Sequence, residues 1–188
     1  GAAIFSHAEA NHVYYLLDDK DPTIDTTVHG ARSLTTDVTN CPAGAASLAI
    51  HLDRLWLLTA AASGPSLLWY TDPFNLNSIR ATNFIQIHGK GVGLIPGQFG
   101  AIDNSLTPRL IIFTQTSVSV LDGDPILGGG VQADLRILRV GLGLRSPHAA
   151  CITPFGAFFL GTDGDLWLIP PGATTVTAVG GPIRNLLG

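Results

Sequence analysis

The sequence carries little charge and few cations. Ten Lys and Arg residues stand against fourteen Asp and Glu residues in a chain of 188, so charged residues make up 13% and the net charge is −4. A nucleic-acid-binding surface needs clustered cations that displace the counterions of the phosphates. We therefore expect no sequence-specific nucleic-acid binding.

Long apolar runs and methionine are absent as well. Gly, Pro, Asp or Ser interrupts every apolar run before it reaches the roughly 20 residues that a membrane-spanning helix requires, so we expect no membrane span. The chain starts at Gly1 and contains no Met. Its length fits one domain. We expect a single domain over residues 1–188, either as a processed product or as a piece of a longer chain.

Cysteine is scarce, and histidine is scattered. Cys41 and Cys151 lie 110 residues apart, and no Cys-x-x-Cys motif is present. No ligand spacing links the six histidines, which are His7, His12, His29, His51, His88 and His148. A metal site is therefore not expected. A disulfide would require the fold to bring the two cysteines together, and we do not expect one.

Two glycine-containing motifs resemble ligand-binding loops only loosely. No Gly-Lys-Ser/Thr follows the glycines at positions 89, 91, 93 and 97, so they predict a loop or a strand edge instead of a phosphate site. The motif Asp163-Gly164-Asp165 lacks the spaced oxygen ligands and final Glu of a calcium loop. Because it separates two apolar runs, it predicts a hairpin turn.

No residue pattern indicates catalysis. Asp72, Asp122 and Asp163 each fall at the end of an apolar run or in a turn, where the turn-forming chemistry of Asp explains them. A Gly-x-Ser-x-Gly nucleophile motif is missing. We therefore predict no catalytic, cofactor-binding or metal-binding residues, no cofactor and no enzymatic activity.

Apolar residues dominate what is present. They make up 46% of the chain, and the mean hydropathy is +0.33. This composition is unusually apolar and charge-poor for a solvated monomer. We expect other protein to cover much of its surface.

The segment 47–89 predicts one complete four-stranded β unit. Four apolar runs, at 47–52, 54–59, 67–71 and 83–88, are separated by Asp53, by the breaker cluster 62–66 and by Asp72-Pro73. A four-stranded unit of about 43 residues has the size of one propeller blade.

The same pattern recurs along the chain. Arg54 and Arg109 are 55 residues apart, and Arg109 and Ala157 are 48 residues apart. Periods of about 40–55 residues indicate repeated supersecondary units. We predict an all-β, β-propeller-like fold of about four blade-like antiparallel four-stranded sheets, centred on 13–17, 54–71, 109–121 and 157–169. A β-sandwich is the alternative, because seven or more short strands with regular turns also fit it.

The inter-sheet core is predicted from the apolar residues of these runs. It should include Leu55, Trp56, Leu57, Ile111, Phe113, Phe159, Leu166 and Leu168.

Several segments, taken in order, resemble the phage and prophage β-propeller tail proteins. The similarity begins with Arg54-Leu55-Trp56-Leu57 and continues with Leu68-Trp69-Tyr70-Thr71-Asp72-Pro73-Phe74. Further similar segments lie at 83–87, 109–113, 117–123, 140–143, 146–148, 158–160, 163–167 and 182–187. The resemblance spans residues 48–187.

This resemblance implies a structural role in a bacteriophage virion, like that of nozzle or tail-hub proteins. It implies a homo-oligomeric ring, virion localisation and contacts with other tail or portal-proximal proteins. It implies no catalytic residues.

The alternative function is a propeller that binds a glycan or another receptor through its loops. Aromatic side chains would then provide stacking surfaces. The candidates are Trp56, Trp69, Tyr70, Phe74 and Trp167. Core packing competes with this interpretation for each tryptophan on a strand.

Overall fold

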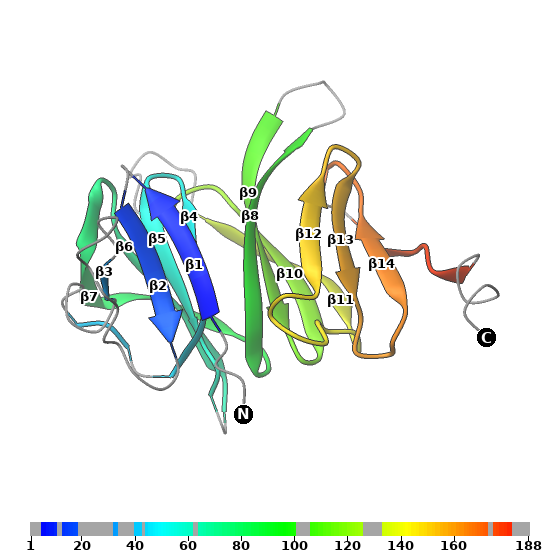
Figure 1. Ribbon diagram of the computed structural model, residues 1–188, viewed down its shortest axis with the longest axis horizontal. Helices are drawn as coiled ribbons and strands as arrows, with labels where there is room; N and C mark the ends of the chain where they lie inside the picture. The colour runs from blue at the N-terminus through cyan, green and yellow to red at the C-terminus, as the bar shows by residue number, and fades with distance from the viewer. Residues whose placement is uncertain are drawn as a thin grey trace. The chain divides into compact units, whose positions relative to one another are not determined.

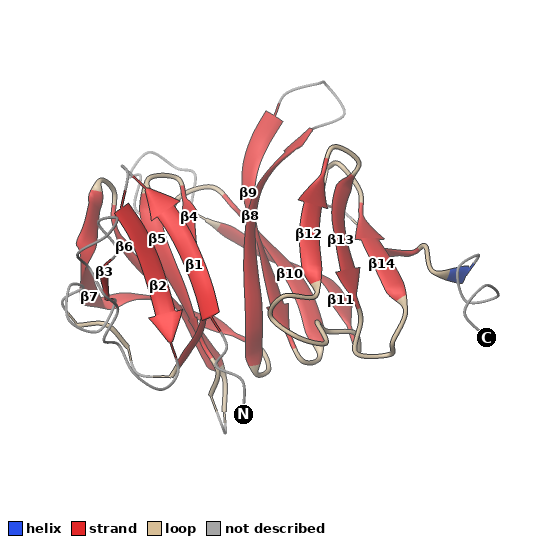
Figure 2. Ribbon diagram, viewed as in Figure 1, coloured by secondary structure: helices blue, strands red, loops and turns tan. Residues whose placement is uncertain are grey.

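The computed structural model describes residues 5–10, 13–18, 32–33, 40–42, 44–61, 64–100, 106–125, 133–172 and 175–181. In these residues, fifteen strands form four sheets, of which three are four-stranded (Figures 1 and 2). This confirms the predicted all-β fold with antiparallel four-stranded sheets of the kind that propellers and sandwiches use. The chain divides into two compact units, residues 1–91 and 92–188.

The first sheet of the N-terminal unit has three described strands. β1 (Phe5–Ala10) and β2 (Val13–Asp18) form an antiparallel hairpin, and β3 (Arg32–Ser33) pairs with β2 in parallel. The predicted sheet around residues 13–17 is therefore present. Its described part contains a parallel pair, where we expected four antiparallel strands.

The second sheet is the predicted unit at 47–89. It is an antiparallel meander in chain order, consisting of β4 (Ala45–His51), β5 (Arg54–Thr59), β6 (Ser66–Asp72) and β7 (Asn75–Ile87). Each predicted apolar run lies on one of these strands. β7 begins eight residues before its predicted run, because polar residues directly after the β6–β7 turn already pair with β6.

Two tight turns lie together at one end of this sheet. Leu52 and Asp53, between β4 and β5, have φ angles of 49° and 55°, as a two-residue type I′ hairpin requires. Between β6 and β7, Pro73 is followed by Phe74 at φ 59°, which is the sequence pattern of a type II turn. The backbone N–H of Phe74 donates to the carbonyl oxygen of Asp53 at 2.9 Å. This hydrogen bond ties the two turns to each other.

Buried polar groups connect β5 to β6 inside the same sheet. The Thr71 hydroxyl accepts a hydrogen bond from the backbone N–H of Leu55 at 3.0 Å. Nη1 of the fully buried Arg54 donates to the carbonyl oxygen of Thr71 at 2.7 Å. Trp56, also fully buried, donates its indole N–H to the carbonyl oxygen of His51 at 2.9 Å.

Thr71→Val should lower the free energy of unfolding by about 1–3 kcal/mol, because it leaves the buried N–H of Leu55 without its acceptor. Urea denaturation measures the loss. Thr71→Ser keeps the hydroxyl and serves as the control, with a smaller expected loss. Equal stability of the Val and Ser variants would contradict the importance of this hydrogen bond.

The C-terminal unit contains two four-stranded sheets. The first has the order β11-β10-β9-β8 and consists of β8 (Gly91–Gly100), β9 (Leu106–Thr114), β10 (Ser117–Asp122) and β11 (Asp134–Val140). The second runs in chain order through β12 (Ala150–Thr153), β13 (Gly156–Leu160), β14 (Leu166–Ile169) and β15 (Thr177–Ala178). Both match predicted blades.

The two sheets of this unit share one apolar core. The rings of Phe113 on β9 and Phe159 on β13 meet at a centroid distance of 5.1 Å. Buried residues from both sheets surround this pair, among them Ile111, Val118, Val120, Ala157 and Ile169. A separate cluster in the N-terminal unit includes Leu48, Leu55, Leu57, Leu76 and Ile79.

Most of the predicted core is buried. Six of the eight residues are at most 1% exposed, namely Leu55, Trp56, Leu57, Ile111, Phe113 and Phe159. Leu166 and Leu168 are only half-buried. Both lie on β14, which pairs on its outer side with the two-residue strand β15, so little of the sheet extends past them.

Candidate functional site

The glycine-rich segment is a strand, as predicted. Gly91 and Gly93 lie on β8. A Cβ atom on Gly91 would lie 2.4 Å from the carbonyl oxygen of Thr59, and one on Gly93 would lie 2.9 Å from a methyl carbon of Leu144. These glycines serve close packing.

The Asp163-Gly164-Asp165 segment is a turn, also as predicted. Gly164 has a φ of 84°. Oδ1 of Asp163 accepts hydrogen bonds from the backbone N–H of Asp165 and from the indole N–H of Trp167, both at 3.1 Å. The carboxylate therefore holds the turn and orients the tryptophan.

The other two aspartates make ion pairs within their sheets. Asp72 pairs with Nη2 of Arg80 at 2.7 Å. Asp122 pairs with Nε of Arg109 at 2.5 Å and also with Arg136. Their positions at strand ends were predictable, but these partners were not, because the ion pairs depend on strand register.

The cysteines are separate thiols, in agreement with the expectation of no disulfide. Cys41 is half-buried, and burial raises the pKa of its thiol. Cys151 lies exposed on β12. His12 and His29 lie outside the described residues. Within the described residues, no group of three or more His, Cys, Asp or Glu side chains is placed to hold a metal ion.

Iodoacetamide at pH 8 should modify Cys151 well before Cys41. The reacting species is the thiolate, and the raised pKa and partial burial of Cys41 reduce both its thiolate fraction and its access. Mass spectrometry of a time course measures the two rates. Unfolding in urea should make them equal. Equal rates in the native protein would contradict the burial of Cys41.

The five candidate stacking residues lie in three different environments. Trp56 and Tyr70 pack against each other inside the sheet at a centroid distance of 5.1 Å, so neither presents a face to a ligand. Trp167 is half-buried beneath the guanidinium of Arg139, 5.7 Å from its ring centroid. Phe74 is 83% exposed at the β6–β7 turn. Trp69 is half-buried and lines a pocket.

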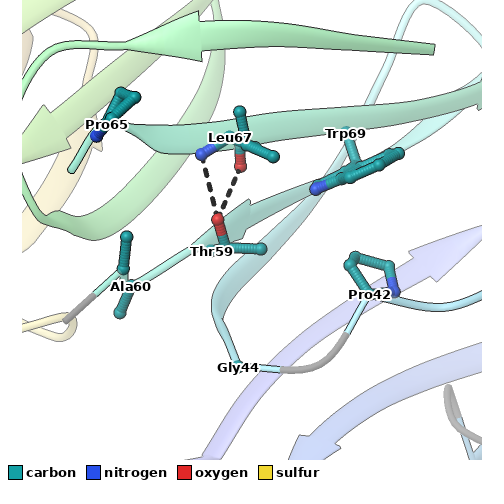
Figure 3. Close-up of a pocket in the computed structure, with 8 residues that line it drawn as sticks. Pro42, Gly44, Thr59, Ala60, Pro65, Leu67 and Trp69 are labelled. Carbon is teal, nitrogen blue, oxygen red and sulfur yellow. Dashed lines mark hydrogen bonds between the residues drawn. The ribbon is translucent and has the colours of Figure 1, made fainter. Parts of the chain in front are cut away.

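This pocket, which we call the Trp69 pocket, lies in the N-terminal unit (Figure 3). Its volume is about 440 Å³. It lies where β5 ends and β6 begins, and its walls include Pro42, Gly44, Thr59, Pro65, Leu67 and Trp69. No charged side chain is among the described residues that line it.

The polar groups of the Trp69 pocket are few. The Thr59 hydroxyl is occupied, because it accepts the backbone N–H of Leu67 at 2.9 Å and donates to the Leu67 carbonyl oxygen at 3.2 Å (Figure 3). The indole N–H of Trp69 is buried and meets no acceptor among the described residues. Buried donors are normally paired, so this N–H is the group most available to a ligand. The sequence singled out Trp69, but the proline walls come from segments without apolar periodicity.

No family model and no curated protein matches this chain. In the part of the chain that the structure describes, no helix is long and apolar enough to span a membrane.

Proposed function

We propose that this chain is a non-enzymatic structural module of a bacteriophage virion, of the tail or nozzle type, that acts by assembling with copies of itself and with other virion proteins. The observation that supports this most is the exposure of large apolar side chains. They occur on two turns and on several strands, at Phe74, Phe84, Ile137, Val140, Ile152 and Phe155.

Strand β11 illustrates why this exposure favours assembly. It is an outer strand of its sheet, and none of its residues is buried. Ile137 is 53% exposed and Val140 is 67% exposed. An outer strand with unpaired backbone groups and exposed apolar side chains is a template for pairing with another chain unless charges or a bulge protect it. Contact with a neighbouring protein would bury these groups.

The composition and the resemblance support the same proposal. Only 13% of the residues are charged, which leaves few groups to solvate a free surface. Repeated four-stranded sheets give a stiff scaffold, and a tail requires stiff walls. The segments at 54–57 and 68–74, which resemble phage tail propellers, form β5, the later part of β6 and the turn after it.

The test is to search for this chain by mass spectrometry in purified particles, alongside a screen of the purified protein against host-surface glycans. We expect stoichiometric presence in particles and no saturable glycan binding. Tight glycan binding together with absence from particles would favour the competing glycan-binding proposal. Under that alternative, replacing an exposed aromatic such as Phe74 by Ala would abolish glycan binding and leave assembly intact.

A further inference from the structure

The Trp69 pocket and the Pro73-Phe74 turn lie at opposite ends of the same two strands. β5 begins beside Asp53 and ends at Thr59, while β6 begins at Ser66 and ends at Asp72. The turn is at the Asp53 and Asp72 end, and the pocket is at the Thr59 and Ser66 end. Seven residues of strand span about 20 Å at roughly 3.3 Å per residue. Phe74 therefore cannot enter the pocket of its own chain.

The Pro73-Phe74 turn presents a rigid apolar knob. Phe74 is 83% exposed, although its φ of 59° is unfavourable for a bulky residue. Pro73 fixes the preceding backbone angle, and the hydrogen bond to the Asp53 carbonyl holds the turn. A group that is already fixed in place loses little conformational entropy on binding.

The Trp69 pocket selects for an apolar group with one hydrogen-bond acceptor. Its proline and tryptophan walls are stiff, and none of its described lining residues is charged. The Trp69 N–H needs an acceptor, whereas the Thr59 hydroxyl is already paired. A sugar would bury several hydroxyls with almost no partners, which is costly. A peptide turn carrying a phenyl ring and a backbone carbonyl fits these requirements.

We propose that the Trp69 pocket of one copy receives the Pro73-Phe74 turn of a second copy, with the phenyl ring on the apolar walls and a carbonyl of the turn accepting the Trp69 N–H. The inference rests on the assembly function proposed above and names its contact. Because knob and pocket are different surfaces, the contact is head to tail, which generates rings when the rotation between copies closes and filaments otherwise.

The area of this contact fixes its expected strength. A phenylalanine side chain buries about 150–250 Å², whereas a stable interface buries roughly 800 Å² on each partner. The knob is thus an anchor that needs additional contacts around it. Two copies should associate weakly, and assembly should strengthen when each copy uses both its knob and its pocket.

A mixing experiment with two complementary variants tests this contact. Phe74→Ser removes the knob, and Ala60→Arg, at the wall of the pocket, blocks the socket. By sedimentation velocity over a concentration series, we expect wild type to form large oligomers and each variant alone to associate at least tenfold more weakly. The mixture should form dimers and nothing larger, because only one knob and one socket remain. The indole N–H resonance of Trp69, assigned with Trp69→Phe, should shift only in the mixture.

Two further variants serve as controls. Phe74→Leu keeps an apolar knob and should retain assembly, and Gln86→Ala, exposed on β7 of the same sheet, should behave as wild type. Thermal melts establish that each variant is folded. Wild-type oligomer size in both Phe74→Ser and Ala60→Arg would overturn this contact and leave the assembly function standing, as would a mixture of folded variants that stays monomeric. A wild type that is monomeric at every concentration would overturn both proposals.

Discussion

Replacing Phe113 or Phe159 by Ala is expected to lower the free energy of unfolding by about 3–5 kcal/mol. Both rings are at most 1% exposed and contact each other across the shared core of the C-terminal unit, at a centroid distance of 5.1 Å. Each truncation removes buried apolar surface and leaves a cavity that neighbouring strands fill only in part. Because one cavity abuts the other, the double variant should lose less than the sum of the single losses.

Urea denaturation measures these losses, with Phe158→Ala as the matched control. Phe158 precedes Phe159 on β13 and is only half-buried, so its replacement should cost clearly less. Should the Phe113 and Phe159 variants both melt within a degree or two of wild type, the two sheets do not share this core.

Gly156→Ala is expected to destabilise the C-terminal unit by about 2–6 kcal/mol. Gly156 has a φ of 122°, and a Cβ atom there would lie 2.1 Å from the carbonyl oxygen of Ile169. The backbone conformation costs a non-glycine residue about 1–3 kcal/mol, and forcing an atom into a packed site adds roughly 1–3 kcal/mol. The obstacle is backbone, so no side-chain rotation relieves it.

Gly164→Ala separates these two costs. Gly164 also has a positive φ, 84°, but a Cβ atom there would come no closer than 3.5 Å to another group, the end of the Arg145 side chain. The Gly164 variant should therefore lose only the cost of backbone strain in a urea titration. A Gly156 variant as stable as the Gly164 variant would show that β13 and β14 do not pack as closely as described.

Hairpins were the part of the fold that the sequence predicted best. The runs 109–113 and 117–121 became β9 and β10, with a turn at Gln115 and Thr116 between them. Alternation of apolar and polar residues with turn residues between the runs is a local signal, so one sequence suffices to recognise it. The core positions Ile111 and Phe113 follow from the same alternation.

Features that depend on register were not predictable. The parallel pairing of β3 with β2 and the ion pair between Arg109 and Asp122 join segments whose alignment no local pattern reveals. The type I′ turn at Leu52 and Asp53 lacks the usual Asn-Gly or Asp-Gly signature. Hydrogen bonding of the flanking strands imposes this turn on residues that disfavour it.

The candidate site was predicted only in part. Trp69 and Phe74 were identified as candidate stacking residues, because aromatic side chains near turns are common binding groups. The pocket itself depends on Pro42 and Pro65, which lie in irregular segments and come together only when β4 to β6 pair. That Trp56 is core and Trp69 is not follows from which face of the sheet is covered.

The native mass of the purified full chain tests the assembly proposal most directly. Light scattering or native mass spectrometry over a concentration series should give a discrete multiple of 19.7 kDa, reached at lower concentrations as more copies associate. A single 19.7 kDa species that persists at high protein concentration would contradict it.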